Sequence, residues 1–161
     1  MYAVLFEFEA KQGRFDDYYA IALELRPDVD KIDGFLGIER FASRATPDRY
    51  LSLSTWRDEA AIAAWREFQR HRAAQAKGRG ELFADYRLRV GEVVESGGTV
   101  TAVEGRGLSG GGEVFDSVVT PGKTLILGAE DVSGAIDRTL RVQVLRDYGM
   151  FSRDEAPRRN S

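Results

Sequence analysis

The sequence contains no cysteine and one histidine among its 161 residues. Without cysteine there are no disulfides, catalytic thiolates, iron–sulfur clusters or zinc ribbons, and His71 alone cannot form a multi-histidine metal site. No apolar run approaches the roughly 20 residues that a membrane-spanning helix needs. The first residues also lack a basic, apolar leader. We therefore expect a cytoplasmic protein with no membrane partner and no metal.

Neither sign of charge dominates. The chain has 23 Lys plus Arg against 26 Asp plus Glu, a formal net charge of −3. It lacks the basic stripe that neutralises phosphates in nucleic-acid-binding proteins, so nucleic acid is not an expected partner. A chain of this length buries roughly 70% of its unfolded surface, which is sufficient for an apolar core without a structural metal.

Residues 1–96 predict the order strand, helix, strand, strand, helix, strand. The strands combine apolar alternation with aromatic and β-branched residues, and the helices show apolar residues at helical spacing. Pro27 is expected to stop the first helix because it lacks a backbone donor. The predicted strands are residues 2–8, 35–43, 50–56 and 83–95, and the helices are residues 14–26 and about twenty residues from Asp58.

Residues 97–161 form a β-rich C-terminal extension in this interpretation. The glycine-rich stretch 105–112 is predicted to be a flexible loop, and residues 114–119, 124–127 and 139–145 to be strands. Residues 124–129 faintly echo residues 50–55, which indicates a degenerate partial repeat of the first unit without a long helix. Its unpaired strands are expected to pack on the first unit or on a partner chain.

Three segments carry a family resemblance: residues 34–41, residues 53–65, which read Leu-Ser-Thr-Trp-Arg-Asp-Glu-Ala-Ala-Ile-Ala-Ala-Trp, and residues 71–79. Over residues 1–96 the chain resembles the antibiotic biosynthesis monooxygenase family. The resemblance implies an α+β class fold, a ferredoxin-like βαββαβ antiparallel sheet that pairs with a second copy to form a dimeric α/β barrel. A homodimer is therefore expected, with Leu51 and Leu53 facing the partner.

The resemblance places the active site in the cleft between the sheet and the helices. The side chains expected to contact a substrate there are those of Phe6, Tyr18, Ser52, Ser54, Trp56 and Gln75. His71 or Arg72 is expected to assist proton loss. Histidine is the default base because its ordinary pKa lies near neutrality, and an arginine can steady an anion.

The family includes enzymes that oxygenate anthrones or hydroquinones with O2 and no cofactor, and this chemistry is the first hypothesis. A non-enzymatic small-ligand-binding or stress-associated dimer, with a filled cleft, is the alternative. A haem-degrading protein is the third. Members of that class use an asparagine on the first strand, a tryptophan at the end of the third strand and a haem-ligating histidine near the end of the second helix. The corresponding residues here are Phe6, Trp56 and Gln75, so only the tryptophan matches.

Overall fold

The computed structural model describes residues 1–75 and 82–157 of the chain. Ten elements follow one another in the sequence. They are β1 (Tyr2–Ala10), α1 (Phe15–Asp30), β2 (Phe35–Ser43), β3 (Arg49–Trp56), α2 (Glu59–Gln75), β4 (Phe83–Val94), β5 (Val100–Ser109), β6 (Glu113–Ser117), β7 (Thr124–Leu127) and β8 (Ser133–Gly149).

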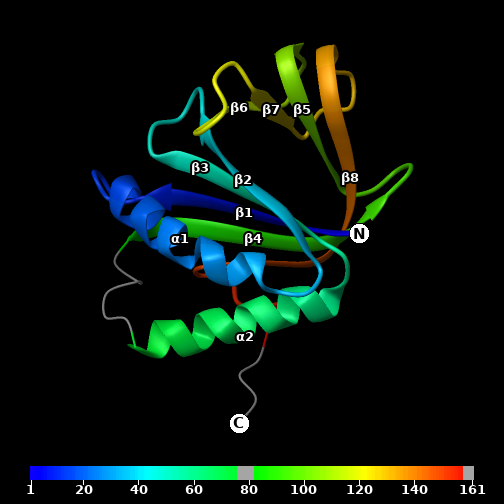
Figure 1. Cartoon of the computed structure of the whole chain (residues 1–161). Helices are drawn as coiled ribbons and strands as arrows, with labels where there is room; N and C mark the ends of the chain where they lie inside the picture. The colour runs from blue at the N-terminus through cyan, green and yellow to red at the C-terminus, as the bar shows by residue number, and fades with distance from the viewer. Residues whose placement is uncertain (76–81, 158–161) are drawn as a thin grey trace.

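The eight strands form one closed antiparallel barrel in the order β1-β3-β2-β6-β7-β5-β8-β4. Both helices lie on one side, against the part of the sheet made by β1–β4 (Figure 1). Strands β5–β7 and the first part of β8 rise from the other side, and the end of β8 returns along β4. The βαββαβ order of the first unit agrees with the sequence prediction. The space between this half of the sheet and the helices is the place where a site can form.

Helix α1 passes through Pro27 and continues to Asp30, so the prediction that proline ends it was wrong. The last turn carries Val29, which is 4% exposed and packs in one cluster with Trp56 and Ile62. Burying an apolar side chain of this size contributes roughly 1.5–3 kcal/mol, which offsets the backbone hydrogen bond that proline cannot make.

The C-terminal strands close the barrel within one chain, because β6 pairs with β2 and β8 pairs with β4. Leu51 and Leu53 were expected to face a partner subunit, but they are 0% and 2% exposed inside this barrel. Their neighbours there include Phe115 from β6 and Leu140 from β8. The sheet face predicted to meet a second copy is therefore covered by the chain's own extension.

The glycine-rich stretch predicted to be a loop belongs largely to β5. Val100 and Ala102 point into the barrel core. Gly105 lies directly beside the backbone of Ala135 on β8, and a Cβ atom would collide with the carbonyl oxygen of that residue. This glycine serves close strand approach, so its presence was misread as flexibility.

Charged residues from both halves of the chain line the barrel interior beyond its apolar middle. Each half contributes one buried glutamate, Glu7 at 5% exposure on β1 and Glu104 at 2% on β5. Both make ion pairs, because an isolated buried carboxylate is strongly disfavoured. Their cationic partners are Arg49 and Arg89 for Glu7, and Arg138 and Lys123 for Glu104.

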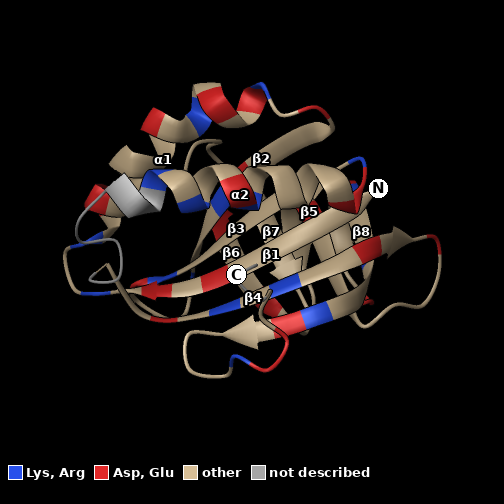
Figure 2. Cartoon of the chain, turned by 90° about the horizontal axis from the view of Figure 1, so that it is seen from below, with Lys and Arg blue, Asp and Glu red and all other residues tan. Residues whose placement is uncertain are grey.

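Seen from the helix side, basic and acidic residues are interspersed along α1 and α2 (Figure 2). This mixture agrees with the small net charge of −3. Of the two helices that the described ranges contain, neither has the length and apolar character needed to cross a membrane.

Candidate functional site

A cavity of about 330 Å³ lies between the two helices and the sheet. Its volume is at the lower end of the roughly 300–1,000 Å³ that small-molecule sites occupy. The lining comes from β1–β4, from both helices and from β8. The residues are Val4, Phe6, Tyr18, Ile21, Ala22, Leu25, Arg26, Val29, Ile38, Arg40, Ser52, Ser54, Trp56, Ile62, Trp65, Arg66, Gln69, Leu82, Phe83, Leu88, Val90, Arg146 and Tyr148.

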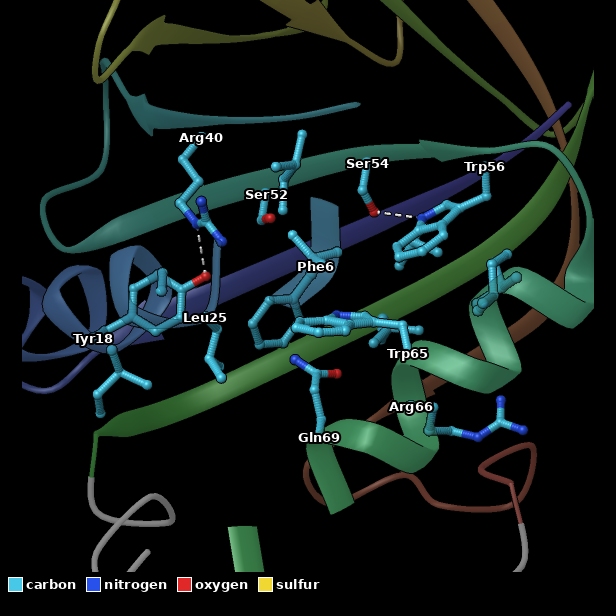
Figure 3. A pocket seen from close by; sticks show the side chains of 18 of the residues that line it. Phe6, Tyr18, Leu25, Arg40, Ser52, Ser54, Trp56, Trp65, Arg66 and Gln69 are labelled. Atoms are coloured by element: carbon cyan, nitrogen blue, oxygen red, sulfur yellow. Dashed lines mark hydrogen bonds between the residues drawn. The ribbon is translucent and has the colours of Figure 1, made fainter. Parts of the chain in front are cut away.

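The sheet wall follows from strand alternation. Successive residues of a strand point to opposite faces, so Ser52, Ser54 and Trp56 share the helix-facing side of β3. Phe6 stands beside Ser52 because β1 and β3 pair in that register. All four were predicted to lie in the cleft, and Figure 3 shows them on one wall of it.

Trp56 forms the closed end of this wall and is 2% exposed. Its indole Nε1 donates a hydrogen bond to Ser54 Oγ over 2.9 Å, and Phe35 meets the ring edge-on with a centroid distance of 5.0 Å. Because its single donor is used by Ser54, Trp56 offers a ligand only its aromatic surface. A flat apolar ring is the chemistry that this end accommodates.

The opposite end of the cavity is polar. Arg40 on β2 donates a hydrogen bond from Nε to the hydroxyl oxygen of Tyr18 on α1, at 3.1 Å, with its guanidinium carbon 5.7 Å from the tyrosine ring centroid. Figure 3 shows Arg40 extending toward Tyr18 near Ser52, while Arg66 on α2 extends away from them. Tyr18 was predicted from the sequence, whereas Arg40 was missed.

Helix α2 contributes Ile62, Trp65, Arg66 and Gln69 to the lining. Ile62, Trp65 and Gln69 are three and four residues apart and therefore share one helix face, and Arg66 lies four residues after Ile62. Trp65 stacks on Phe68 at a centroid distance of 5.4 Å. Gln69 directs its amide toward Trp65 and Leu25 (Figure 3) and can offer hydrogen bonds to a ligand.

The two residues predicted to assist proton loss do not lie in the cavity. The His71 side chain is 80% exposed and lies 3.7 Å from a carboxylate oxygen of Glu67. Arg72 is also exposed and absent from the lining. They lie near the end of α2, two and three residues beyond Gln69, and neither side chain lines the cavity. The Gln75 side chain lies outside the described residues.

The lining is basic without an acidic counterpart. It includes Arg26, Arg40, Arg66 and Arg146, and among the described residues it contains no Asp, Glu or His. Arg26 donates to Asp30 and Arg146 to Glu59, so both are neutralised locally. Arg40 and Arg66 make no ion pair among the described residues, and the described lining lacks a carboxylate or imidazole base.

Strand β8 adds a phenol to the site. Tyr148 lines the cavity, and burial raises the pKa of its hydroxyl above 10.0, although Arg66 opposes this rise. The phenol is therefore protonated at neutral pH and acts as a hydrogen-bond donor. No local signal in the sequence assigned Tyr148 to the cleft, because its position depends on the long-range pairing of β8 with β4.

A histidine-ligated haem does not fit this cavity. The single imidazole, that of His71, lies outside it, and the chain has no cysteine. Within the described ranges, no three His, Cys, Asp or Glu side chains gather as a metal site would require.

These features describe an α+β barrel with a small-molecule cavity between sheet and helices. The family model for antibiotic biosynthesis monooxygenase matches residues 1–77. A jasmonate monooxygenase from Pyricularia oryzae is 34% identical over 98% of this chain and 97% of its own length. The chain belongs to the antibiotic biosynthesis monooxygenase family.

Two other proteins are similar over different portions of the chain. An uncharacterised Bacillus subtilis protein, YqjZ, is 38% identical over 37% of this chain and 51% of its own. A crystal structure described as that of an anthrone oxidase-like protein has a TM-score of 0.45 and 11% identity. It covers 98% of this chain and 96% of that one.

Proposed function

We propose that the chain is a cofactor-independent monooxygenase that uses O2 to oxidise a small ring compound of the anthrone or hydroquinone type. The observation that carries the proposal is the cavity beside Trp56, about 330 Å³ in volume and walled by aromatic side chains. A non-enzymatic dimer with a filled cleft would leave no such space. Family membership and the jasmonate monooxygenase relative support oxygenation of a small organic molecule.

In this reaction the substrate supplies the electrons. A ring methylene group next to an unsaturated, carbonyl-bearing ring system loses a proton, and the carbanion reduces O2 to form a carbon–oxygen bond. Protonation gives a hydroperoxide, whose O–O bond breaks as the remaining hydrogen of that carbon leaves as a proton. The products are a ketone and water. One oxygen atom of O2 enters the substrate, and the other leaves as water with both methylene hydrogens.

The protein contributes desolvation, orientation and a positive potential. The aromatic faces of Trp56 and Trp65 exclude water and hold the ring, and Gln69 and Tyr148 donate hydrogen bonds to developing oxyanions. The unbalanced arginines of the lining favour the anionic form of the substrate. This lowers the substrate's pKa, so the proton can leave to solvent without a histidine or carboxylate base.

We also infer that the extension, residues 97–161, replaces a partner subunit. The extension would then be a partial repeat without helices. It covers the sheet face through which members of the family are expected to dimerise. Burial of Leu51 and Leu53 against β6 and β8 supports this assignment, and Tyr148 on β8 makes the extension part of the site. A homodimer would have to form through another surface.

Isotope labelling tests the function. Metal-free protein is incubated with ¹⁸O2 and a panel of anthrones and hydroquinones, and products are corrected for spontaneous autoxidation. We expect saturable turnover, with one ¹⁸O atom in each quinone formed from an anthrone. Trp56→Ala, checked for folding by circular dichroism, is expected to abolish it. Unchanged turnover in this variant would refute the assigned site.

A further inference from the structure

The polar end of the cavity contains a cation without an acidic counterion. Arg40 is half-buried on β2, and its described side-chain hydrogen bond goes to a neutral phenol, Tyr18, through Nε. No ion pair joins it to a carboxylate within the described ranges. Its Nη groups therefore keep hydrogen-bonding capacity that Tyr18 does not use. Other arginines of the sheet do have acidic partners: Arg49 and Arg89 both pair with the buried Glu7.

Tyr18 is oriented as a second donor. Its hydroxyl oxygen accepts the Arg40 hydrogen bond at 3.1 Å, so its own hydrogen remains available to another acceptor. The ring is held by Phe8 at a centroid distance of 4.5 Å and by Phe83 at 5.6 Å. This packing fixes the direction of the hydroxyl toward Arg40.

Ser52 provides the third donor. It pairs directly with Arg40 across β2 and β3, and it is 5% exposed. Side chains opposite each other in an antiparallel pair have Cβ atoms about 4.5–5.5 Å apart, so the two heads are neighbours on the cavity wall. The Ser52 hydroxyl has no hydrogen bond to a described residue, which contrasts with Ser54, whose oxygen is used by Trp56.

Three donors, one of them charged, therefore meet at one end of a cavity whose lining carries no described acid. We propose that Arg40, Tyr18 and Ser52 bind the carboxylate of the ligand, so that the protein selects small carboxylates with an apolar ring. The guanidinium provides charge-assisted hydrogen bonds to the carboxylate, and the ring extends toward Trp56. Treating this ligand as the substrate depends on the proposed function, but the binding itself does not.

Tryptophan fluorescence gives a direct test, because both tryptophans of the sequence, Trp56 and Trp65, line the cavity. The full chain is titrated with cyclohexylacetate and with its neutral analogue cyclohexylacetamide, neither of which absorbs where tryptophan is excited. We expect saturable change with the carboxylate and at least tenfold weaker binding of the amide. Arg40→Gln should weaken carboxylate binding about 10- to 100-fold and amide binding less than threefold, in line with a hydrogen bond to a charged group.

Arg44→Gln is the matched control, since Arg44 directly follows β2 but lies outside the cavity lining, is exposed and pairs with Asp116. It should leave both titrations within threefold of the parent. Arg40→Lys retains the charge and should recover part of the carboxylate preference, which separates loss of charge from misfolding. Equal binding of the two probes, no carboxylate binding, or equal effects of the Arg44 and Arg40 variants would each overturn the proposal.

Measurements of oxygen uptake distinguish failure of the proposed carboxylate site from failure of the proposed oxygenase function. Turnover of a neutral anthrone without binding of cyclohexylacetate would overturn the carboxylate site and leave the oxygenase assignment intact. Arg40-dependent binding of cyclohexylacetate, with no turnover of any anthrone or hydroquinone, would support the site and contradict the oxygenase assignment.

Discussion

Glu39 on β2 and Glu113 on β6 make the same kinds of contact at opposite ends of the β2–β6 pair. Glu113 accepts hydrogen bonds from Arg49 Nε at 2.7 Å and from a serine on β2 at 3.1 Å. Glu39 accepts them from Lys123 Nζ at 2.7 Å and from a serine on β6 at 2.5 Å. The serines are Ser43 and Ser117. The cations of the two groups are also alike, because each contacts a second, buried glutamate. Arg49 pairs with Glu7, and Lys123 pairs with Glu104.

These two glutamates predict acid sensitivity. The hydrogen bond from Arg49 holds the pKa of Glu113 below 4.5. Burial pushes the pKa of Glu39 upward, but hydrogen bonds from Lys123 and Ser117 outweigh it, and the net pKa is also lowered. A folded-state pKa below the unfolded value stabilises the protein above about pH 4.5, and this stabilisation is lost as the pH falls through the folded pKa.

Urea unfolding between pH 6 and pH 3.5 measures this effect. The free energy of unfolding should fall steeply below about pH 4.5 in the parent protein. It should fall less in the double variant Glu39→Gln/Glu113→Gln, which starts from a lower value at pH 6. The exposed Glu9→Gln serves as control and should follow the parent. A double variant with the parent's slope would contradict the assigned ion pairs.

The barrel core predicts that the folded chain is stable as a monomer. Leu51 is fully buried against strands of its own chain, so Leu51→Ala should lower the free energy of unfolding by about 2–5 kcal/mol. This loss should not depend on protein concentration, and light scattering should give 17.9 kDa. Leu36→Ala, at a position 55% exposed, should change stability by about 0.5 kcal/mol or less. A concentration-dependent midpoint would instead indicate a partner subunit.

Removal of residues 97–161 should expose the apolar face that contains Leu51 and Leu53. An exposed sheet face of this kind binds hydrophobic dyes, aggregates or pairs with a second copy. We expect the truncated chain to be either insoluble or dimeric, with increased dye fluorescence if soluble. A soluble, folded monomer after truncation would show that the extension is not needed to cover this face.

A glycine substitution distinguishes strand from loop at β5. Gly105→Ala should destabilise the protein by about 1–3 kcal/mol, because a methyl group would collide with the backbone of Ala135. Gly111→Ala is the matched control, since nothing lies within 4 Å of a Cβ atom there. Thermal unfolding of the two variants compares them directly. Equal midpoints would mean that residue 105 does not approach β8 closely.

The sequence was most informative where structure depends on neighbouring residues. The alternation of β1 and β3 correctly predicted that Phe6, Ser52, Ser54 and Trp56 share a wall, because side-chain direction has a period of two. It was less informative for α2. Arg72 was expected to assist proton loss, but the pattern of the helix cannot indicate where along it the cavity ends.

Barrel closure could not be predicted from local pattern. It depends on pairing Phe41 with Ser117 and Val90 with Arg146, which are far apart in the sequence. The glycines of β5 also imitate a loop, because the backbone contact that requires Gly105 comes from a distant strand. Arg40 and Tyr148 were missed for the same reason, since their roles appear only once the strands and helices meet around the cavity.

Oxygen uptake by a cavity-filling variant tests the central claim, that this cavity is the oxygenation site. Ala22 lines the cavity and Ala20 is exposed on the same helix, so Ala22→Phe fills the space while Ala20→Phe adds the same group outside. With the best substrate of the anthrone and hydroquinone panel, Ala20→Phe should retain the parent rate and Ala22→Phe should lose at least 90% of it, that is, about 1.4 kcal/mol or more in the barrier. Equal rates for a folded Ala22→Phe and Ala20→Phe would contradict the account.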